Sequence, residues 1–370
     1  MWDVSDSDLS SLVDEMTSEE KADLLTGKGL WRTAANYRLN IPEIIMTDGT
    51  YGVRYSIDQI DGINDERTNL EQFLSVVNQR ADQPLAPDFS STRPATCFPN
   101  GSAFGCSWDV DLAYELGRVL AAECQAFGVN LLLGPGINIR RTPLGGRSYE
   151  YYAEDPVLAG DLAASVINGL QKNGVGASLK HFACNNSEIQ RTTMSSDVDE
   201  RALREIYLAG FERAIRKSNP WTVMSSYNRL NGVQAAESHW LLTKVLRDEW
   251  NYDGLVVSDW HGIKDRPAAA IAGNDLDMPE SRSRRRRLLA AMENGSVPMA
   301  AVDQSCIRIL ELVRRAKGGE RRDATFDLEA NHELARKMAA ESIVLLKNEG
   351  PLLPLPPGLK RIVVIGKPSS

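Results

Sequence analysis

Hydrophobic and polar positions follow one repeating order along most of the chain. From residue 109 on, helix-like segments each lead into a short apolar run, as where "DVDLAYELGRVLAAECQAFG" precedes "VNLLLGPGINIRR" (129–141). Alternating helices and short buried strands predict a parallel sheet of βα units, and this many units favour a closed barrel over an open sheet. Further apolar runs of this kind cover residues 175–186, 221–232, 253–262 and 274–279.

Polar residues end each of these predicted strands. Asp259 and Trp260 close the run "LVVSDW" (255–260), and Asp48 closes an earlier run, "IPEIIMTDG" (41–49). A single polar residue can simply cap its strand, but the same placement in several strands predicts a shared pocket, because the ends of parallel barrel strands meet on one face. The other strand ends carry Asn138 and Arg140, Lys180 and His181, and Tyr227 and Asn228.

The pattern changes after residue 300. A last barrel helix is predicted to end at Gly318 and Gly319, and it is followed by another helix, a proline-rich link and the apolar run "RIVVIG" (361–366). We therefore expect a barrel over residues 1–316, a linker over 317–340, and over 341–370 the first elements of a second α/β domain that continues in the full protein. Residues 57–96 are polar with little periodicity, so we expect a loop or insertion there.

Composition excludes several classes of function. The chain has 370 residues, of which 42% are hydrophobic and 25% charged, as in ordinary globular proteins. Its net charge of -8 argues against nucleic acid as a partner, because phosphate binding needs a basic surface. We expect no membrane association, since no apolar run approaches spanning length. With no secretory pattern at the start, we expect a cytoplasmic protein, or a periplasmic or secreted one if a signal was removed.

The sequence also gives little support for a metal site or a cofactor site. The five cysteines are odd in number and widely spaced, which indicates a reduced set rather than a disulfide framework. None of the four histidines lies at metal-ligand spacing. The "GPG" at 134–136 lacks the spacing of a phosphate-binding loop. We therefore expect no metal and no cofactor.

The residue types at the strand ends suit carbohydrate chemistry. Aromatic rings such as that of Trp260 stack on sugar faces, while charged side chains hydrogen-bond vicinal hydroxyls. A carboxylate such as Asp259 can attack the anomeric carbon and stabilise an oxocarbenium-like transition state. Purely structural interpretations remain open: Asp48 as a turn residue, Arg147 as an ion-pair partner, Lys180 and His181 as a structural strand end, and Tyr227 as a core residue with a satisfied hydroxyl.

Five segments together resemble glycoside hydrolase family 3 β-glucosidases. The resemblance runs along nearly the whole chain in the family's order, with 57–96 the least similar part. It implies a retaining exo-β-glycosidase that releases terminal non-reducing β-D-glucosyl residues from small β-glucosides or oligosaccharides. It also implies a (β/α)8 TIM-like barrel, a linker and an α/β sandwich domain. The segments are "GPGINIRRTPLGGRSYEYYAEDP" (134–156), "KHFACNNSE" (180–188), "VMSSYNRLNG" (223–232), "GLVVSDW" (254–260) and "ESIVLLKNEGPLLPL" (341–355).

The resemblance also implies roles for single residues. Asp259 falls on the nucleophile that forms the glycosyl-enzyme, and Trp260 falls on a platform for the sugar. Tyr227 would hydrogen-bond to the nucleophile and hold it ionised. The residues expected to bind hydroxyls in the −1 subsite are Asp48, Arg147, Lys180 and His181.

Several positions depart from the family pattern. Thr50 replaces the Pro of D-G-P, Ser187 replaces the Gln of N-N-Q-E, and His261 follows Trp260. The acid/base of two-domain relatives is a Glu from the second domain, which we expect beyond residue 370. Neither Glu154 nor Glu237 matches its motif.

Two alternatives remain at this point. One is a β-xylosidase, although xylosidase relatives often carry a smaller residue where this chain has Trp260. The other is a catalytically impaired sugar-binding barrel that lacks an acid/base domain. A homo-oligomer is compatible with either function.

Overall fold

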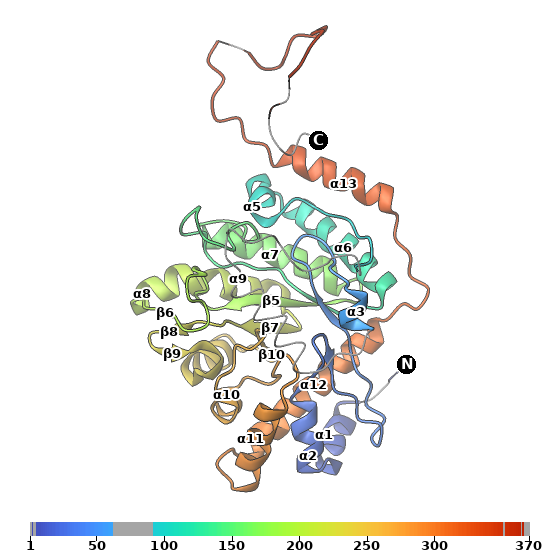
Figure 1. The fold of residues 1–370 in the computed structure, drawn as a ribbon, viewed down its shortest axis with the longest axis vertical. Coiled ribbons are helices and arrows are strands. Elements are labelled where there is room, and N and C mark those ends of the chain that lie inside the picture. Colours follow the sequence, from blue (N-terminus) through green and yellow to red (C-terminus); the bar gives the residue numbers. More distant parts are fainter. Residues whose placement is uncertain (1, 3–4, 62–91, 351, 364, 366–370) are drawn as a thin grey trace.

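A five-stranded parallel sheet lies at the centre of the computed structural model, which describes residues 2, 5–61, 92–350, 352–363 and 365 (Figure 1). Its order is β10-β7-β5-β4-β3, and every neighbouring pair is parallel. The strands are short and buried, as the apolar runs predicted. They are β3 (Met46–Asp48), β4 (Leu131–Leu133), β5 (Gly176–Phe182), β7 (Thr222–Ser225) and β10 (Leu255–Ser258).

Shorter segments continue this sheet and close it into a ring. Leu276 pairs in parallel with β10, and Asp277 pairs in parallel with Thr26. The antiparallel hairpin of β1 (Gly27–Lys28) and β2 (Arg32–Thr33) follows Thr26 directly. A bridge from β2 to Ile45, the residue before β3, completes the circuit. The predicted TIM-like barrel is thus confirmed, with antiparallel pairing at the hairpin where a regular (β/α)8 barrel has parallel pairing.

Helices flank the sheet on both sides (Figure 1). The start and end of α6 (Val110–Phe127) follow from its sequence: the Asp109 side chain accepts from two backbone N–H groups, and Gly128 ends the helix with a positive φ of 73°. The Asp155 side chain likewise caps α7 (Pro156–Gln171), with proline in the first turn. The other connecting helices are α9 (Ala209–Ser218), η5 (Trp240–Glu249), α10 (Arg266–Ala272), α11 (Arg282–Glu293) and α12 (Met299–Gly319).

Smaller elements complete the described part. They include a three-stranded sheet of order β6-β8-β9, which matters for the site below. The remaining bounds are α1 (Asp6–Glu15), α2 (Ser18–Leu24), α3 (Ile57–Ile60), α5 (Gly101–Phe104), η2 (Gly105–Ser107), β6 (Ser195–Ser196), α8 (Glu200–Ala202), η3 (Leu203–Leu208), β8 (Arg229–Leu230), β9 (Val233–Gln234), η4 (Ala235–Glu237) and α13 (Leu328–Glu341).

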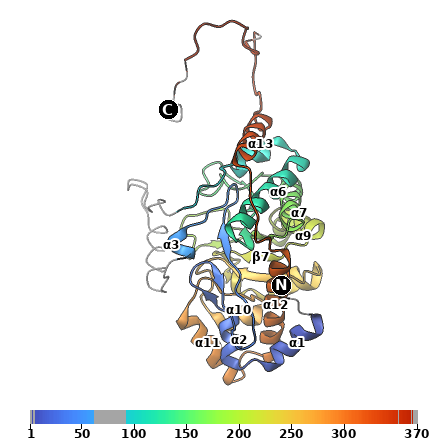
Figure 2. The same cartoon turned by 90° about the vertical axis from the view of Figure 1, so that its right-hand side faces the viewer.

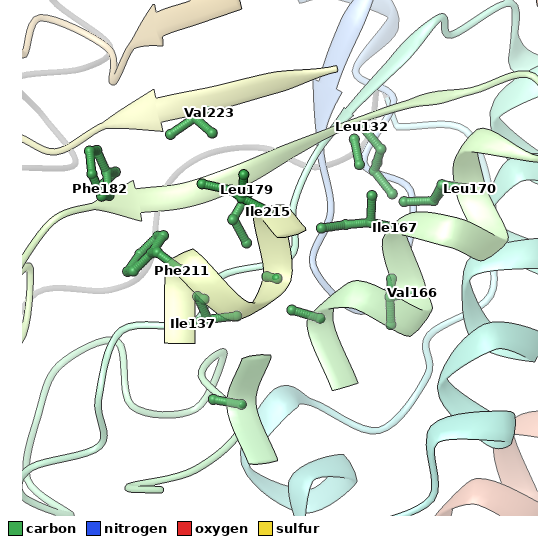
Figure 3. Packing of buried hydrophobic residues seen from close by; sticks show 14 of the residues in the cluster. Leu132, Ile137, Val166, Ile167, Leu170, Leu179, Phe182, Phe211, Ile215 and Val223 are labelled. Atoms are coloured by element: carbon green, nitrogen blue, oxygen red, sulfur yellow. The ribbon is translucent and has the colours of Figure 1, made fainter. Parts of the chain in front are cut away.

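Alternate residues of the strands pack into two hydrophobic clusters, because successive side chains of a strand point to opposite faces. Leu132 and Val223 belong to the cluster with α6, α7 and α9. Figure 3 shows Leu179 of β5 near Ile215 and Phe182 near Phe211, both on α9. Leu131 and Met224, the neighbours of Leu132 and Val223, belong to the cluster with α1, α2, α11 and α12. The alternation therefore determines which side chains of each strand pack into one cluster and which pack into the other.

The predicted linker, 317–340, holds the end of α12 and most of α13. Helix α13 contacts α5 and η2, and its Met338 is completely buried. Nδ2 of Asn331 in α13 donates to Oε1 of Glu123 in α6 at 2.9 Å. Beyond it the described chain extends away from the barrel, as Figure 1 and Figure 2 show. Residues 361–363 and 365 of the apolar run predicted as a strand form no strand and are exposed. The domain boundaries stay predictions.

The predicted loop or insertion at 57–96 is only partly described. Residues 57–60 form α3, Ser56 bridges to Thr92, and residues 62–91 lie outside the described residues. Among the helices that the structure describes, none combines the length and the apolar character needed to cross a lipid bilayer.

Candidate active site

The predicted site residues come together where the barrel strands end. Asp48 is the last residue of β3, Lys180 and His181 lie near the end of β5, and Asp259 directly follows β10. Tyr227 follows β7 by two residues. Since the strands are parallel, these ends share one face of the barrel, as expected from the sequence.

Asp259 is buried, with 5% of its surface exposed. The backbone N–H of Trp260 donates to its Oδ1 at 2.8 Å, and the Tyr227 hydroxyl also hydrogen-bonds to the carboxylate. Burial raises the pKa of Asp259 to about 6, while Arg147, Lys180 and the Tyr227 hydrogen bond oppose the rise. The carboxylate is therefore held ionised near neutral pH by cations and a phenol rather than by water.

His181 is neutral, with its proton on Nδ1. Nη2 of Arg147 lies 2.8 Å from Nε2, and a guanidinium can only donate, so Nε2 accepts. Nδ1 lies 3.3 Å from Oδ1 of Asn138 and 3.2 Å from the hydroxyl of Tyr151. Burial and the neighbouring cations keep the pKa of His181 well below its ordinary value. Its 3.7 Å approach to Oδ2 of Asp259 is consequently not an ion pair.

Asp48 and Lys180 form the second charged contact of the site. Nζ of the buried Lys180 donates to Oδ1 of Asp48 at 2.6 Å, and Nη1 of Arg54 lies 3.3 Å from Oδ2. Burial alone raises the pKa of Asp48, but the cations Lys180 and Arg54 outweigh it and hold that pKa well below its ordinary value. Asp48 is thus an ionised acceptor, not merely a turn residue.

Arg147 lies between Glu150 and His181 and bonds to both. Its Nε donates to the buried carboxylate of Glu150, three residues further on, while Nη2 reaches His181. Each partner fixes one edge of the planar guanidinium, which leaves it little freedom to turn. Arg147 therefore forms the ion pair that the alternative interpretation predicted, with Glu150. The same side chain also contacts His181 of the site.

Trp260 is more enclosed than a sugar platform requires. Its indole N–H donates to the carbonyl of Leu30 at 2.9 Å, its ring packs 5.1 Å from that of Trp31, and 8% of its surface is exposed. The stacking role of Trp260 stays a prediction.

Several residues of the site were not singled out from the sequence. Arg54 follows Asp48 by six residues, and nothing in that spacing indicates that the two side chains meet. Tyr151 and Arg191 approach the predicted residues from loops. The run "SYEYY" after "GGR" contains Tyr151, but nothing in the sequence distinguishes that residue from its neighbours.

The two glutamates considered as substitutes for an acid/base lie in different surroundings. Glu154 is exposed. One carboxylate oxygen of Glu237 accepts from the backbone N–H groups of Lys264 and Asp265, each at 2.7 Å, just before α10 begins. Glu237 therefore holds the start of that helix.

A parallel barrel that collects a buried carboxylate, a phenol bonded to it and several donors at its strand ends has the site of a barrel glycosidase. The comparisons agree. Residues 88–312 match the model described as "Glycosyl hydrolase family 3 N terminal domain". The chain belongs to glycoside hydrolase family 3, as the motifs predicted.

Individual relatives cover nearly all of this chain. It is 45% identical over 349 residues to thermostable beta-glucosidase B of Acetivibrio thermocellus, which is 94% of this chain and 43% of that protein. Among solved structures, the GH3 beta-glucosidase of Bifidobacterium adolescentis has 40% identity and a TM-score of 0.81, covering 93% of this chain and 46% of that one. Beta-glucosidase 3B of Thermotoga neapolitana, in complex with alpha-D-glucose, has 34% identity and a TM-score of 0.80, with 93% and 48% covered. This chain spans less than half the length of these relatives.

Proposed function

We propose that the protein is a retaining exo-β-glycosidase that releases terminal non-reducing β-D-glucosyl residues through a glycosyl-Asp259 intermediate. One observation carries the proposal: Asp259 is buried at the end of β10, hydrogen-bonded by Tyr227, and within the field of Arg147 and Lys180. A carboxylate so placed is a poor base for water and a well-oriented nucleophile. The names of the relatives support a β-glucoside as substrate.

The charged pairs supply the sugar ligands. Asp48, ionised, accepts from a sugar hydroxyl, and Lys180 donates to one. Arg147 donates to a further hydroxyl. His181, 3.7 Å from Asp259, borders the same subsite and orients the guanidinium of Arg147 through Nε2. Such charge-assisted hydrogen bonds strengthen as positive charge develops at the anomeric carbon.

Two displacements complete the reaction. An oxygen of Asp259 bonds to the anomeric carbon as the bond to the leaving oxygen breaks, and water then displaces Asp259. A second carboxyl, roughly 5 Å from the first, gives the leaving oxygen its proton and later takes one from water. We expect this carboxyl in a part of the full protein beyond residue 370.

Replacing Asp259 by Asn tests the nucleophile. Asp259→Asn keeps the shape and removes the charge that attacks carbon, so kcat is expected to fall by several orders of magnitude. A 2-deoxy-2-fluoro-β-glucoside with a good leaving group is expected to add one sugar to Asp259 of the wild type, found by peptide mass spectrometry. Asp253→Asn, an exposed aspartate before the start of β10, is the matched control. A label on another residue, or full labelling of the Asn variant, contradicts the assignment.

A pentopyranosidase is the second candidate. The exo-alpha-(1->6)-L-arabinopyranosidase of Bifidobacterium longum is 41% identical to this chain over 347 residues, which is 94% of this chain and 43% of that protein. Similar sequences therefore occur in proteins named for a pentose. Comparing kcat/KM for dinitrophenyl β-D-glucoside, β-D-xyloside and α-L-arabinopyranoside separates these possibilities. A preference for either pentoside overturns the glucosidase proposal, and sugar binding without any labelling of Asp259 indicates a binding barrel.

A further inference from the structure

A cation lies against the ring of Tyr227, on the tyrosine that hydrogen-bonds to Asp259. The guanidinium carbon of Arg191 is 5.1 Å from the centre of that ring. Nη1 of Arg191 lies 3.0 Å from Oε2 of Glu188, and both side chains are mostly buried, with 19% and 18% exposed. A mostly buried cation over a phenol ring is attracted more strongly than one in water.

The small sheet β6-β8-β9 explains why these two residues meet. β6 begins four residues after Arg191, and β8 begins two residues after Tyr227. The two strands pair in parallel, with Ser195 opposite Arg229, and the backbone N–H of Arg229 donates to the carbonyl of Met194 at 3.0 Å. The pairing therefore fixes the loop of Arg191 against the loop of Tyr227.

Glu188 connects the same loop to the one that carries Arg147. A Cβ built on Gly146 would lie 3.0 Å from Cγ and 3.1 Å from Cβ of Glu188, so only a glycine allows this approach without a shift. Arg147 is the next residue. Glu188 thus packs against one functional loop while its carboxylate holds the cation over Tyr227.

We propose that Arg191 is a positioning residue that acts on Asp259 through Tyr227, with Glu188 fixing its place. The inference deepens the proposed function and rests on it. The cation restricts the tilt of the phenol ring, so the hydroxyl keeps its hydrogen bond to Asp259. Its charge also makes the phenol a stronger donor, which strengthens the bond to an ionised carboxylate.

The charges around Tyr227 agree with this role. Burial and the charge of Asp259 raise the pKa of Tyr227 well above its ordinary value, and Arg191 and Arg147 oppose the rise. Tyr227 therefore stays protonated and donates a hydrogen bond to Asp259. The other charged groups that act on Asp259 are Arg147 and Lys180, and the neutral His181 lies 3.7 Å from its Oδ2.

The test compares four variants of the 370-residue chain. Arg191→Met removes the cation and keeps apolar bulk, Arg191→Lys restores a charge, and Glu188→Gln removes the anchor. Arg118→Met is the matched control, because Arg118 pairs with Glu115 at the same i,i+3 spacing on the outside of α6. The measurement is inactivation by the 2-deoxy-2-fluoro-β-glucoside as a function of inhibitor concentration and pH.

We expect Arg191→Met to lower the maximal inactivation rate by about 10- to 30-fold with little change in the half-saturating concentration. The acidic limb of the rate should move to higher pH, since a weaker Tyr227 hydrogen bond stabilises ionised Asp259 less. Lys should recover part of the rate, Glu188→Gln should lie between, and Arg118→Met should match the wild type.

An unchanged rate and pH profile in a folded Arg191→Met protein overturn the proposal, even if its melting temperature falls. If the wild type itself forms no adduct, the proposed function fails, and the geometry is decided separately by crystal structures of the wild type and Arg191→Met. A Tyr227 hydroxyl that leaves Asp259 in the variant supports the positioning role. A Tyr227 that stays in place contradicts it.

Discussion

At the scale of single residues, the buried charge of Asp259 lowers the stability of the folded chain. A carboxyl whose pKa is raised from 3.8 to about 6 binds its proton more tightly in the folded state than in the unfolded one. Stability is therefore lost as pH rises between these two values, and the loss is complete above the higher one. At about 1.4 kcal/mol per pKa unit, it amounts to roughly 1 to 3 kcal/mol.

The same Asp259→Asn variant should consequently melt at a higher temperature than the wild type at about pH 8. Asn resembles the protonated acid, so the difference should shrink towards about pH 4. Melting curves across this pH range, with Asp253→Asn alongside, measure it. A variant that is less stable than the wild type at every pH would mean that the cations around Asp259 depend on its charge.

His181 provides a second prediction at this scale. Its pKa lies well below the ordinary value of 6.5, so the folded state binds a proton less readily than the unfolded state. Stability from His181 is present above about pH 6.5 and falls below it. Its ring carbon signal in NMR should not titrate between about pH 8 and 5 in the folded protein, and should titrate in urea. A titration near 6.5 in the folded protein would contradict the neutral Nδ1–H form.

Residues at strand ends were predictable, and residues that reach in from loops were not. Asp259, Lys180 and Asp48 each end an apolar run, so hydrophobic period and parallel topology together place them on one face. Arg54 and Arg191 approach from loops whose paths depend on turns and on the pairing of two-residue strands. Such strands are too short to show a period.

At the scale of elements, the closure of the barrel depends on the segment around Asp275 as much as on the regular strands. The fully buried carboxylate of Asp275 accepts from Arg247 at 2.8 Å and from Arg308 at 3.0 Å, and also from the backbone N–H of Val256 in β10. One side chain thus joins η5, β10 and α12. The sequence run "NDLDMP" predicted a strand there but not this network.

Asp275→Asn is expected to destabilise the chain by about 3 to 5 kcal/mol, because it leaves two mostly buried guanidinium groups without this anion. The control is Asp248→Asn, which breaks the exposed pair with Lys244 and should cost less than about 1 kcal/mol. Urea denaturation measures both. Equal effects of the two variants would show that the Asp275 network contributes no more than a surface pair.

The hairpin of β1 and β2 and the docking of α13 were beyond prediction for different reasons. The hairpin strands have two residues each, so no alternation could appear. A helix before residue 341 was expected from its period, but a period does not say which surface the apolar side packs against. In the structure, Met338 packs into the hydrophobic cluster of the barrel, and Asn331 donates to Glu123 of α6.

At the scale of the whole molecule, the chain corresponds to 43% of the length of the beta-glucosidase of Acetivibrio thermocellus, and we propose that its site supplies the nucleophile and the sugar ligands. A retaining glycosidase also needs the second carboxyl. A leaving group as good as dinitrophenolate departs without a proton, whereas the sugar alkoxide of cellobiose does not. Comparing the two substrates therefore tests whether the 370-residue chain can react without that second carboxyl.

We expect the 370-residue chain to form the glycosyl-enzyme with dinitrophenyl β-glucoside and to hydrolyse cellobiose poorly, by about 100-fold or more relative to a chain that contains the acid/base. Deglycosylation should also be slow, because we expect the base that activates water to lie outside these residues. Added azide needs no base, so it should restore turnover of the dinitrophenyl substrate and yield β-glucosyl azide, detectable by mass spectrometry. The control is Asp259→Asn, which should show no azide effect. Efficient cellobiose hydrolysis by a chain of verified mass would place the acid/base within these residues, and Glu154 and Glu237 would then be the first to replace.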